Sequence, residues 1–440
     1  KEAKGRTVRT LLPYAQTIAD EILEWLKKDP SIKRADALGS LRRKAATVGD
    51  IDLAAATNSP SSTIEHFTKF PNATRILEKG DRTAAIVIGS GKQVDLMVES
   101  PNAYGALLQH FTGSKHHNIA LREYALKKNL SLSDYGIYVK KAGKKLLKKI
   151  ATEEEFYSFL DMDWISPELR ENGGEIQAAL GHNLPILVEL ADIKADLQIH
   201  SDYDIETSHD VGESSMEEIV GKANDLGYEY IAFTEHNPSK SKHNERQMVE
   251  ILKRKQSIVD KLNYSIMKRV KYRVKKVFNS LEIDILPNGD LPVPDEGMET
   301  LDFALVSIHS SFGLDRKSMT ARVLKGLAHP KVKIFAHPTG RKLNFREGVD
   351  LDWPKIFEFC LENDKWLEIN AEPMRLDLPD VLVRDAVKLG LKLTLGTDAH
   401  NRLGMENMIY GINVARRGWA TKNDIVNTRT LQEFEKLLKD

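Results

Sequence analysis

The sequence predicts a multidomain protein in which a mixed α+β part precedes an α/β part. Its 440 residues suffice for two or three domains of about 150 residues each. Before residue 193, short apolar runs separated by Gly, Asn and charged turns are expected to be strands, and they stand between helical patterns. From Ile193 onward, apolar runs alternate with amphipathic helical patterns, which is typical of a parallel α/β sheet or barrel.

The composition excludes several classes of protein. Cys360 is the only cysteine, so no disulfide can form within the chain and a cytoplasmic location is expected. We find neither an apolar run of about 18 residues nor a signal peptide, so no membrane role is expected. Lys and Arg exceed Asp and Glu over residues 1–160, and the reverse holds afterwards. A basic front part fits a polyanionic partner, although solvated surface charge explains the pattern equally well.

In the first part, apolar spacing predicts a helix over Ala15–Leu26, ended by Pro30. Strands are then expected at Ala35–Leu38, Ile51–Ala56, Ala84–Ile88 and Gln93–Val98. Helices follow within Tyr104–Lys128, broken at Thr112–Ser114, and at Glu153–Leu160 after the charged stretch Lys140–Lys149. The segment from Pro167 to Pro185 contains two adjacent glycines and is the best candidate for a linker.

In the second part, most of the expected strands end at polar residues. These strands are Leu197–His200, Ile231–His236, Leu281–Ile285, Leu305–His309, Ile334–His337, Leu367–Asn370 and Leu393–His400. The basic stretch Lys240–Lys276 is expected to be mainly a solvated helix and loop.

Three aspartates form the first candidate site. Asp50 and Asp52 are two residues apart on an expected strand, so their carboxylates point to the same face. Asp95 stands on a later strand that we expect alongside. Three acids on one face repel each other unless cations lie between them. Two divalent ions about 4 Å apart would relieve that repulsion and drive in-line phosphoryl transfer.

A Gly-Ser turn precedes these aspartates. Gly39 lets backbone N–H groups approach a phosphate, Ser40 adds a hydroxyl, and Arg43 can neutralise phosphate charge. A lone Asp-x-Asp is weak evidence, because solvated acids at strand ends are common. The turn together with a third strand acid is a much stronger signal.

The Gly39–Arg43 turn, the three aspartates and the segment Phe111–Arg122 resemble the palm of family X DNA polymerases. The resemblance implies that Asp50, Asp52 and Asp95 are catalytic and hold two Mg²⁺ or Mn²⁺ ions. It further implies that Ser40 and Arg43 bind a triphosphate, and that Phe111 and Gly113 lie against the sugar. Asn118 would reach the minor-groove edge of the incoming base, and Arg122 the template. The implied nucleotide-binding residues are Gly39, Ser40, Arg43, Gly49, Phe111, Thr112, Gly113, Asn118 and Arg122.

Two features depart from the pattern of this family. His110 stands where these enzymes often have Tyr, which leaves the strictness of sugar discrimination open. Members usually begin with a lyase-type domain and helix-hairpin-helix elements, which do not stand before Lys1 in this sequence. We expect poor DNA affinity and poor gap filling from a chain that lacks them, since sequence-independent affinity comes mainly from phosphate contacts.

Histidines at strand ends form the second candidate site. In α/β barrels the carboxyl ends of the strands face one mouth, where the chemistry takes place. A single His there is more often structural, but five of them with nearby carboxylates indicate bound metal ions. The strand-end candidates are His200, His236, Glu282, His309, His337, Asp398 and His400.

The order of these motifs resembles the PHP (polymerase and histidinol phosphatase) domain, a distorted seven-stranded α/β barrel that hydrolyses phosphoesters. The resemblance implies three ions, usually Zn²⁺, Mn²⁺ or Fe²⁺, held by those seven residues and by His209 or Asp210 from the loop after His200. Gln198 replaces the first His of the usual His-x-His, and an amide is a poor zinc ligand, so we expect a weak or empty position. Glu235 replaces an Asp and is expected to shift a hydrogen bond behind the ligands.

Together the two resemblances imply a DNA repair polymerase joined to a 3′–5′ exonuclease or 3′ phosphodiesterase. The expected partners are gapped primer–template DNA and deoxynucleoside triphosphates, and the protein is expected to be a monomer. The expected regions are a palm at 1–100, a nucleotide-binding lobe at 101–165, a linker at 166–192 and a PHP domain at 193–440. Two alternatives stay open: a PHP domain that serves only as a metal-stabilised scaffold, and a palm that adds nucleotides without a template or modifies RNA or a small molecule.

Overall fold

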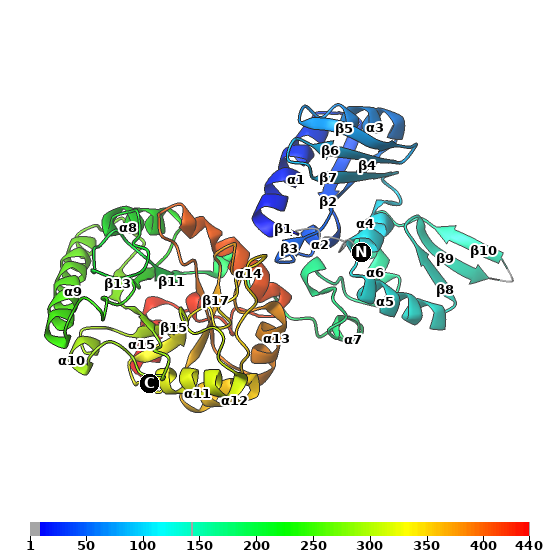
Figure 1. Cartoon of the computed structure of the whole chain (residues 1–440). Helices are drawn as coiled ribbons and strands as arrows, with labels where there is room; N and C mark the ends of the chain where they lie inside the picture. The colour runs from blue at the N-terminus through cyan, green and yellow to red at the C-terminus, as the bar shows by residue number, and fades with distance from the viewer. Residues whose placement is uncertain (1–8, 142–143, 440) are drawn as a thin grey trace, which may run out of the picture. The chain divides into compact units, whose positions relative to one another are not determined.

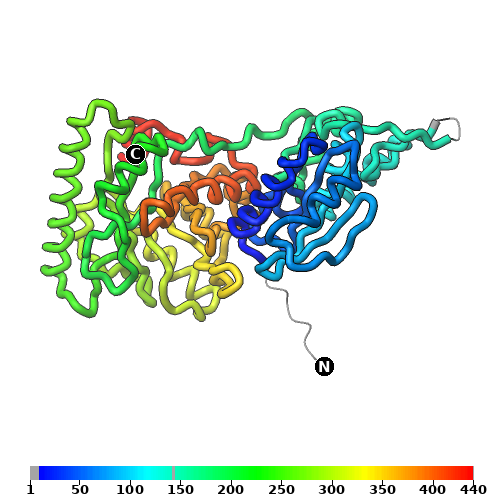
Figure 2. The backbone as a smooth tube through the Cα atoms, turned by 90° about the horizontal axis from the view of Figure 1, so that it is seen from above, coloured from blue at the N-terminus to red at the C-terminus, as the bar shows by residue number. Residues whose placement is uncertain are grey.

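The computed structural model describes residues 9–141 and 144–439 of the chain. The chain divides into two compact units, residues 1–185 and residues 186–440, called the first and the second unit below. Figures 1 and 2 trace the backbone of both units. Within the described part of the chain, every helix is too short or too polar to span a membrane.

A mixed five-stranded sheet forms the centre of the first unit, in the order β2-β4-β7-β6-β5. β4 and β7 are parallel, and the other neighbouring pairs are antiparallel. The strands are β2 (Ile32–Ala37), β4 (Ile51–Thr57), β5 (Ala73–Lys79), β6 (Thr83–Ile88) and β7 (Gln93–Glu99). The four predicted strands are present. β5 lies at the edge and is almost wholly exposed, so its sequence lacks the apolar alternation of a half-buried strand.

Helices pack on this sheet through regularly spaced apolar side chains. α1 (Leu12–Leu26) has Pro13 in its first turn, where the missing N–H is not needed. Its buried residues recur every three or four positions and face β2 and β4, while α3 (Pro60–Thr68) packs on β6 and β7. Short elements complete this region: β1 (Thr10–Leu11), α2 (Gly39–Arg42) and β3 (Thr47–Val48).

The rest of the first unit begins with two helices. α4 (Tyr104–Thr112) packs its apolar side chains against Leu38, Ala54 and Ala56, and α5 (Lys115–Lys127) follows. The predicted break between these helices is confirmed. The remaining elements are β8 (Leu130–Ser133), β9 (Gly136–Lys141), β10 (Lys144–Lys148), α6 (Glu153–Ser158), the 3-10 turn Pro167–Leu169 and α7 (Glu175–Leu180).

The segment 166–192, expected as a linker, packs over its first half into the first unit. Arg170 is fully buried and donates to Glu153, and the buried Glu175 bonds to His117. These partners lie 17 and 58 residues away in the sequence, so the contacts that bury the segment do not show in its own residues. Its glycines and charged residues resemble those of an exposed linker.

The second unit contains two parallel sheets, with helices between the successive strands of each sheet (Figure 1). One sheet has the order β11-β12-β13 and the other β14-β15-β16-β17-β18. The strands are β11 (Ala195–Ile199), β12 (Tyr230–Phe233), β13 (Lys276–Asn279), β14 (Glu282–Asp284), β15 (Ala304–Ser307), β16 (Val332–Phe335), β17 (Trp366–Asn370) and β18 (Leu393–Gly396).

The helices of the second unit cover the sheets, and the last of them completes the core. On α15 (Leu431–Lys439) the buried Phe434 packs against Tyr230, Phe278, Phe303 and Trp366, with ring centroids 4.8–6.0 Å apart. The other helices are α8 (Met216–Asp225), α9 (Glu245–Met267), α10 (Asp295–Met298), α11 (Arg316–Leu327), α12 (Trp353–Glu362), α13 (Asp380–Leu389) and α14 (Met408–Arg417). Three 3-10 turns are Leu190–Asp192, Gly404–Asn407 and Val426–Thr428.

Strand pairing among the described residues does not form the closed seven-stranded barrel that was expected. The extended run from Lys276 to Asp284 is interrupted at Ser280 and Leu281, so β13 pairs with β12 and β14 pairs with β15. Only isolated bridges, Ile199 with Ala399 and His236 with Glu282, connect the two sheets.

The basic stretch 240–276 is mainly an exposed helix and loop, as expected, but it also contains a buried cation. It contains the helix α9, but Lys255 is fully buried there and pairs with Glu235 at 2.5 Å. Its last residue opens β13.

Candidate active sites

β4 and β7 bring the three aspartates of the first unit together. Asp52 lies opposite Asp95 in the parallel pair, and Asp50 directly precedes β4. Burial and repulsion from Asp95 and Asp50 raise the pKa of Asp52 to about 6. Burial also raises the pKa of Asp95, which accepts a hydrogen bond of 2.9 Å from Gln93. Carboxylates whose ionisation is opposed in this way fit a divalent cation, which would offset the repulsion.

The carboxylates of the three aspartates lie farther apart than the ligands of a single bound metal ion. Every described group of three or more possible ligands whose atoms all lie within 4.8 Å of one another belongs to the second unit. One ion would therefore not reach all three aspartates without movement of their side chains.

The Gly-Ser turn approaches these carboxylates closely. Gly39 has a φ of +56°, and an added Cβ would lie 2.9 Å from a carboxylate oxygen of Asp52. Glycine is thus required both by the left-handed backbone and by the approach. Ser40 follows and is half-buried. Gly49 is exposed, and a Cβ there would lie 3.1 Å from the flexible end of Arg9.

Arg43 and Thr112 take part in contacts within the protein. Arg43 donates to the Thr112 carbonyl oxygen and, at 2.9 Å, to Glu171. Thr112 is fully buried, and its hydroxyl accepts a hydrogen bond from Arg42. The side chain of Thr112 is therefore closed to a nucleotide in this structure, and it holds Arg42 instead.

The other nucleotide-binding candidates lie where α4 meets α5. Phe111 is half-buried and packs against the apolar cluster that α4 forms with Leu38, Ala54 and Ala56. Gly113 caps α4 with a φ of +70°. Asn118 donates to the His110 carbonyl oxygen at 2.7 Å and accepts from Gln109. The exposed Arg122 lies 3.4 Å from His110 Nδ1. Asn118 would have to exchange these bonds to contact a base.

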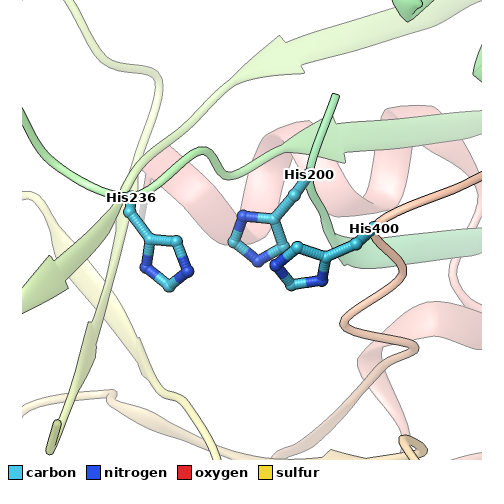
Figure 3. A group of neighbouring side chains, drawn as sticks. All are labelled: His200, His236 and His400. Carbon is cyan, nitrogen blue, oxygen red and sulfur yellow. The ribbon is translucent and has the colours of Figure 1, made fainter. Parts of the chain in front are cut away.

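In the second unit, the strand ends and the loop after β11 bring eight of the predicted ligands together. Four overlapping groups have ligand atoms that all lie within 4.8 Å: His200 with His236 and His400, His209 with His236 and His309, Glu282 with His309 and His337, and His200 with Glu282 and Asp398. Figure 3 shows the first group, whose rings extend from three segments toward one space. Asp210 lines the same cavity but belongs to none of these groups.

Unpartnered nitrogens show that this cluster fits metal ions. Nδ1 of His200, His236 and His337 is buried without a hydrogen-bond partner among the described residues. His200 Nε2, in contrast, lies 3.1 Å from a carboxylate oxygen of Asp398 and 3.3 Å from one of Glu282. A buried polar atom without a partner costs about 1–3 kcal/mol, a cost that coordination would remove. Burial opposes ionisation of Glu282, yet the surrounding imidazoles, His236 foremost, hold its pKa well below the usual range.

Asp284 belongs to this site although sequence reasoning did not single it out. Its carboxylate bonds to His209 Nε2 at 2.6 Å and to His309 Nδ1 at 2.7 Å, and so orients two candidate ligands. The available signal was its position two residues after Glu282, on the same face of a strand.

Gln198 lies inside the cluster with its amide oriented by two hydrogen bonds. Its Nε2 donates to Glu282 at 3.0 Å, and its Oε1 accepts from Asn370 at 3.2 Å. The amide thus presents N–H groups to the candidate ligands, in place of the lone pair that a histidine offers.

Glu235 forms a support behind the ligands. It accepts hydrogen bonds from Ser201 and forms the buried ion pair with Lys255, whose ammonium also donates to the Phe233 carbonyl oxygen at 3.1 Å. The side chain of Glu235, which is longer than that of the Asp it replaces, therefore reaches Lys255 on α9.

Comparisons with known proteins agree with both units. Residues 107–171 match the family model of the DNA polymerase beta thumb. The DNA polymerase/3′-5′ exonuclease PolX of Bacillus subtilis is 32% identical over 440 residues, which cover 100% of this chain and 74% of that protein. A probable phosphatase of Acetivibrio thermocellus is 25% identical over 196 residues, covering 42% of this chain and 73% of that protein.

The fold and the two clusters define a two-unit enzyme that combines a polymerase-type mixed sheet with a phosphatase-like α/β unit. The chain belongs to the family X DNA polymerases, and relatives of PHP-type phosphatases match its C-terminal region.

Proposed function

We propose that the first unit is a repair polymerase that adds deoxynucleotides to a primer 3′ end, and that the second unit removes nucleotides from DNA 3′ ends. The observation that carries the first assignment is the register of Asp52 opposite Asp95, with Asp50 beside them. The relative from Bacillus subtilis, whose name combines both activities, supports the pairing.

In the first unit, Asp50, Asp52 and Asp95 would hold two Mg²⁺ or Mn²⁺ ions. Bound there, such ions supply neutralisation of phosphate charge and activation of the primer hydroxyl. Ser40 and Arg43 bind the triphosphate once Arg43 leaves Glu171, and Phe111 and Gly113 support the sugar. Asn118 and Arg122 then face the base pair and the template, which favours templated addition.

In the second unit, the eight clustered ligands would hold Zn²⁺, Mn²⁺ or Fe²⁺. These ions supply an activated water for phosphodiester cleavage. Asp284 orients His209 and His309, and Glu235 with Lys255 fixes the loop after β12. We assign residues 1–100 to the palm, 101–165 to the nucleotide-binding lobe and 193–440 to a PHP domain. A monomeric state and a cytoplasmic location remain predictions.

Two sets of variants test whether the sites are separate. Asp50→Ala/Asp52→Ala should abolish primer extension on gapped DNA and leave 3′ trimming of a single-stranded oligonucleotide unchanged. His236→Ala/His337→Ala should do the reverse, because no residue is shared. Asp20→Ala, on α1, serves as the matched control. Loss of both activities in either folded double variant would contradict the proposal.

Gln198 favours a second candidate function for the second unit, that of a metal-stabilised scaffold. Elemental analysis combined with a nuclease assay in Mn²⁺ decides between them. Stoichiometric metal without hydrolysis would support the scaffold, and hydrolysis lost in His236→Ala/His337→Ala would support the enzyme. Primer extension with and without a template strand tests the templated reaction of the first unit in the same way.

A further inference from the structure

The metal cluster of the second unit opens into a cavity of about 220 Å³ whose wall is also cationic. Besides the candidate ligands, Phe312 and three basic side chains line it: Lys342, Arg346 and Arg375. None of these four residues belongs to the sequence motifs that define the cluster. Cations beside a metal cluster add to its attraction for an anion.

Arg375 lies in the loop after β17 with part of its hydrogen-bonding capacity unused. Its Nε is 3.5 Å from Asp398, while its Nη1 is buried and has no hydrogen-bond partner in the described part of the chain. Arg341 donates to the Arg375 carbonyl oxygen at 2.9 Å and thus fixes this loop. A phosphate oxygen would satisfy the free N–H groups of such a guanidinium.

Arg346 is held in place by the protein rather than by an acid. Its guanidinium lies 3.7 Å from the centre of the Phe312 ring and donates to the Gly340 carbonyl oxygen at 2.7 Å. Burial lowers the pKa of Arg346, and the charge of Arg375 lowers it further. Two cations gathered in this way repel each other, and an anion between them would remove the cost.

A tight hairpin carries two of these cations. Lys342 and Arg346 exchange backbone hydrogen bonds of 2.9 and 2.8 Å, and Leu343 is tied to the Met374 carbonyl oxygen at 2.7 Å. Phe345 stands next to Arg346 in this hairpin and is 76% exposed. An exposed aromatic ring beside phosphate-binding cations is the combination that single-stranded nucleic acids require.

We propose that Lys342, Arg346 and Arg375 bind the phosphodiester at the end of a single DNA strand, and that Phe345 stacks on a base of that strand. This subsite rests on the proposed hydrolytic function of the second unit and names its substrate class. Water adds to phosphorus and the bond to the 3′ oxygen breaks, which yields a nucleoside 5′-monophosphate and a new 3′-hydroxyl end.

A small phosphodiester tests the cations, and a single-stranded oligonucleotide tests the aromatic ring. In full-length protein with Asp50→Ala/Asp52→Ala and Mn²⁺, Lys342→Ala and Arg346→Ala should raise the KM for bis(p-nitrophenyl) phosphate about tenfold, with a smaller change in kcat. Phe345→Ala should raise the KM for a single-stranded oligonucleotide about tenfold. Lys355→Ala, on α12, and Leu389→Ala, at an exposed apolar position of α13, are the matched controls.

Binding of thymidine 5′-monophosphate, measured calorimetrically in the same background, separates this inference from the proposed activity. Affinity that falls about tenfold in Lys342→Ala and Arg346→Ala supports the subsite even if no hydrolysis is detected. Unchanged KM and unchanged affinity in a chain that still trims DNA would overturn the subsite and leave the proposed function standing.

Discussion

At the residue scale, the candidate ligands could be predicted because most of them directly follow or end apolar runs that the sequence marks as strands. Asp52, His200 and Glu282 stand in short motifs whose spacing fixes a common face. Arg375 and Lys255 could not be found in this way, since their partners Asp398 and Glu235 are distant in the sequence and only the fold joins them.

Gln198→His is expected to increase the metal content of the second unit by one ion per chain. The imidazole would replace an N–H donor to Glu282 by a lone pair that can coordinate. Elemental analysis of the purified protein measures the change, with Gln177→His, at an exposed position of α7, as the control. An unchanged metal content in the folded variant would refute this expectation.

Glu153→Gln is expected to destabilise the first unit by about 3–5 kcal/mol, because the buried guanidinium group of Arg170 and the partly buried one of Arg42 lose their counter-charge. Burial raises the pKa of Glu153, but Arg170 and Arg42 outweigh it and lower the pKa to about 2. The contribution is therefore present above about pH 4.5 and lost as the pH falls toward 2.

Hydrogen exchange of the amides of α6 at pH 7 measures this effect as a loss of protection. The exposed neighbour Glu154→Gln provides the control, and equal protection in both variants would show that the ion pair contributes little.

At the element scale, long periodic segments were predictable and interrupted ones were not. The repeat of buried side chains predicts α1, and the break before Lys115 separates α4 from α5. β13 could not be predicted, because it follows directly on a strongly basic stretch and ends two residues before β14 begins. Two residues outside the ladder, Ser280 and Leu281, separate β13 from β14, and only the segment around β14, Leu281–Ile285, was expected as a strand.

Phe434→Ala on α15 is expected to reduce the stability of the second unit by about 3–5 kcal/mol, since it leaves a cavity between two sheets. Chemical denaturation followed by tryptophan fluorescence measures the loss. Lys436→Ala on the exposed side of the same helix should have almost no effect. Equal stability of the two variants would mean that α15 is not needed for the core.

At the scale of the whole molecule, the two units differ in what holds their sites together. The aspartates of the first unit are partly exposed on a sheet that is packed by apolar helices. The cluster of the second unit is mostly buried and leaves several ring nitrogens without partners among the described residues. Metal binding should therefore contribute to the stability of the second unit far more than to that of the first.

Removal of divalent ions with EDTA is expected to lower the thermal stability of the second unit, and added Zn²⁺ or Mn²⁺ should restore it. Ions present at about a thousand times their dissociation constant contribute about 4 kcal/mol. Calorimetry of the wild-type protein and of Asp50→Ala/Asp52→Ala measures the effect, which should be equal in both. A transition that EDTA does not move would contradict a structural role of the metal.

The position of Phe434 has a consequence for how the protein is made. The core of the second unit draws on β11, near residue 195, and on a ring some 240 residues later in the chain. During translation, the strands emerge before the side chain that fills the space between them. Part of the apolar interior of the nascent second unit therefore stays exposed until Phe434 leaves the ribosome. The residues that form the core of the first unit leave the ribosome earlier.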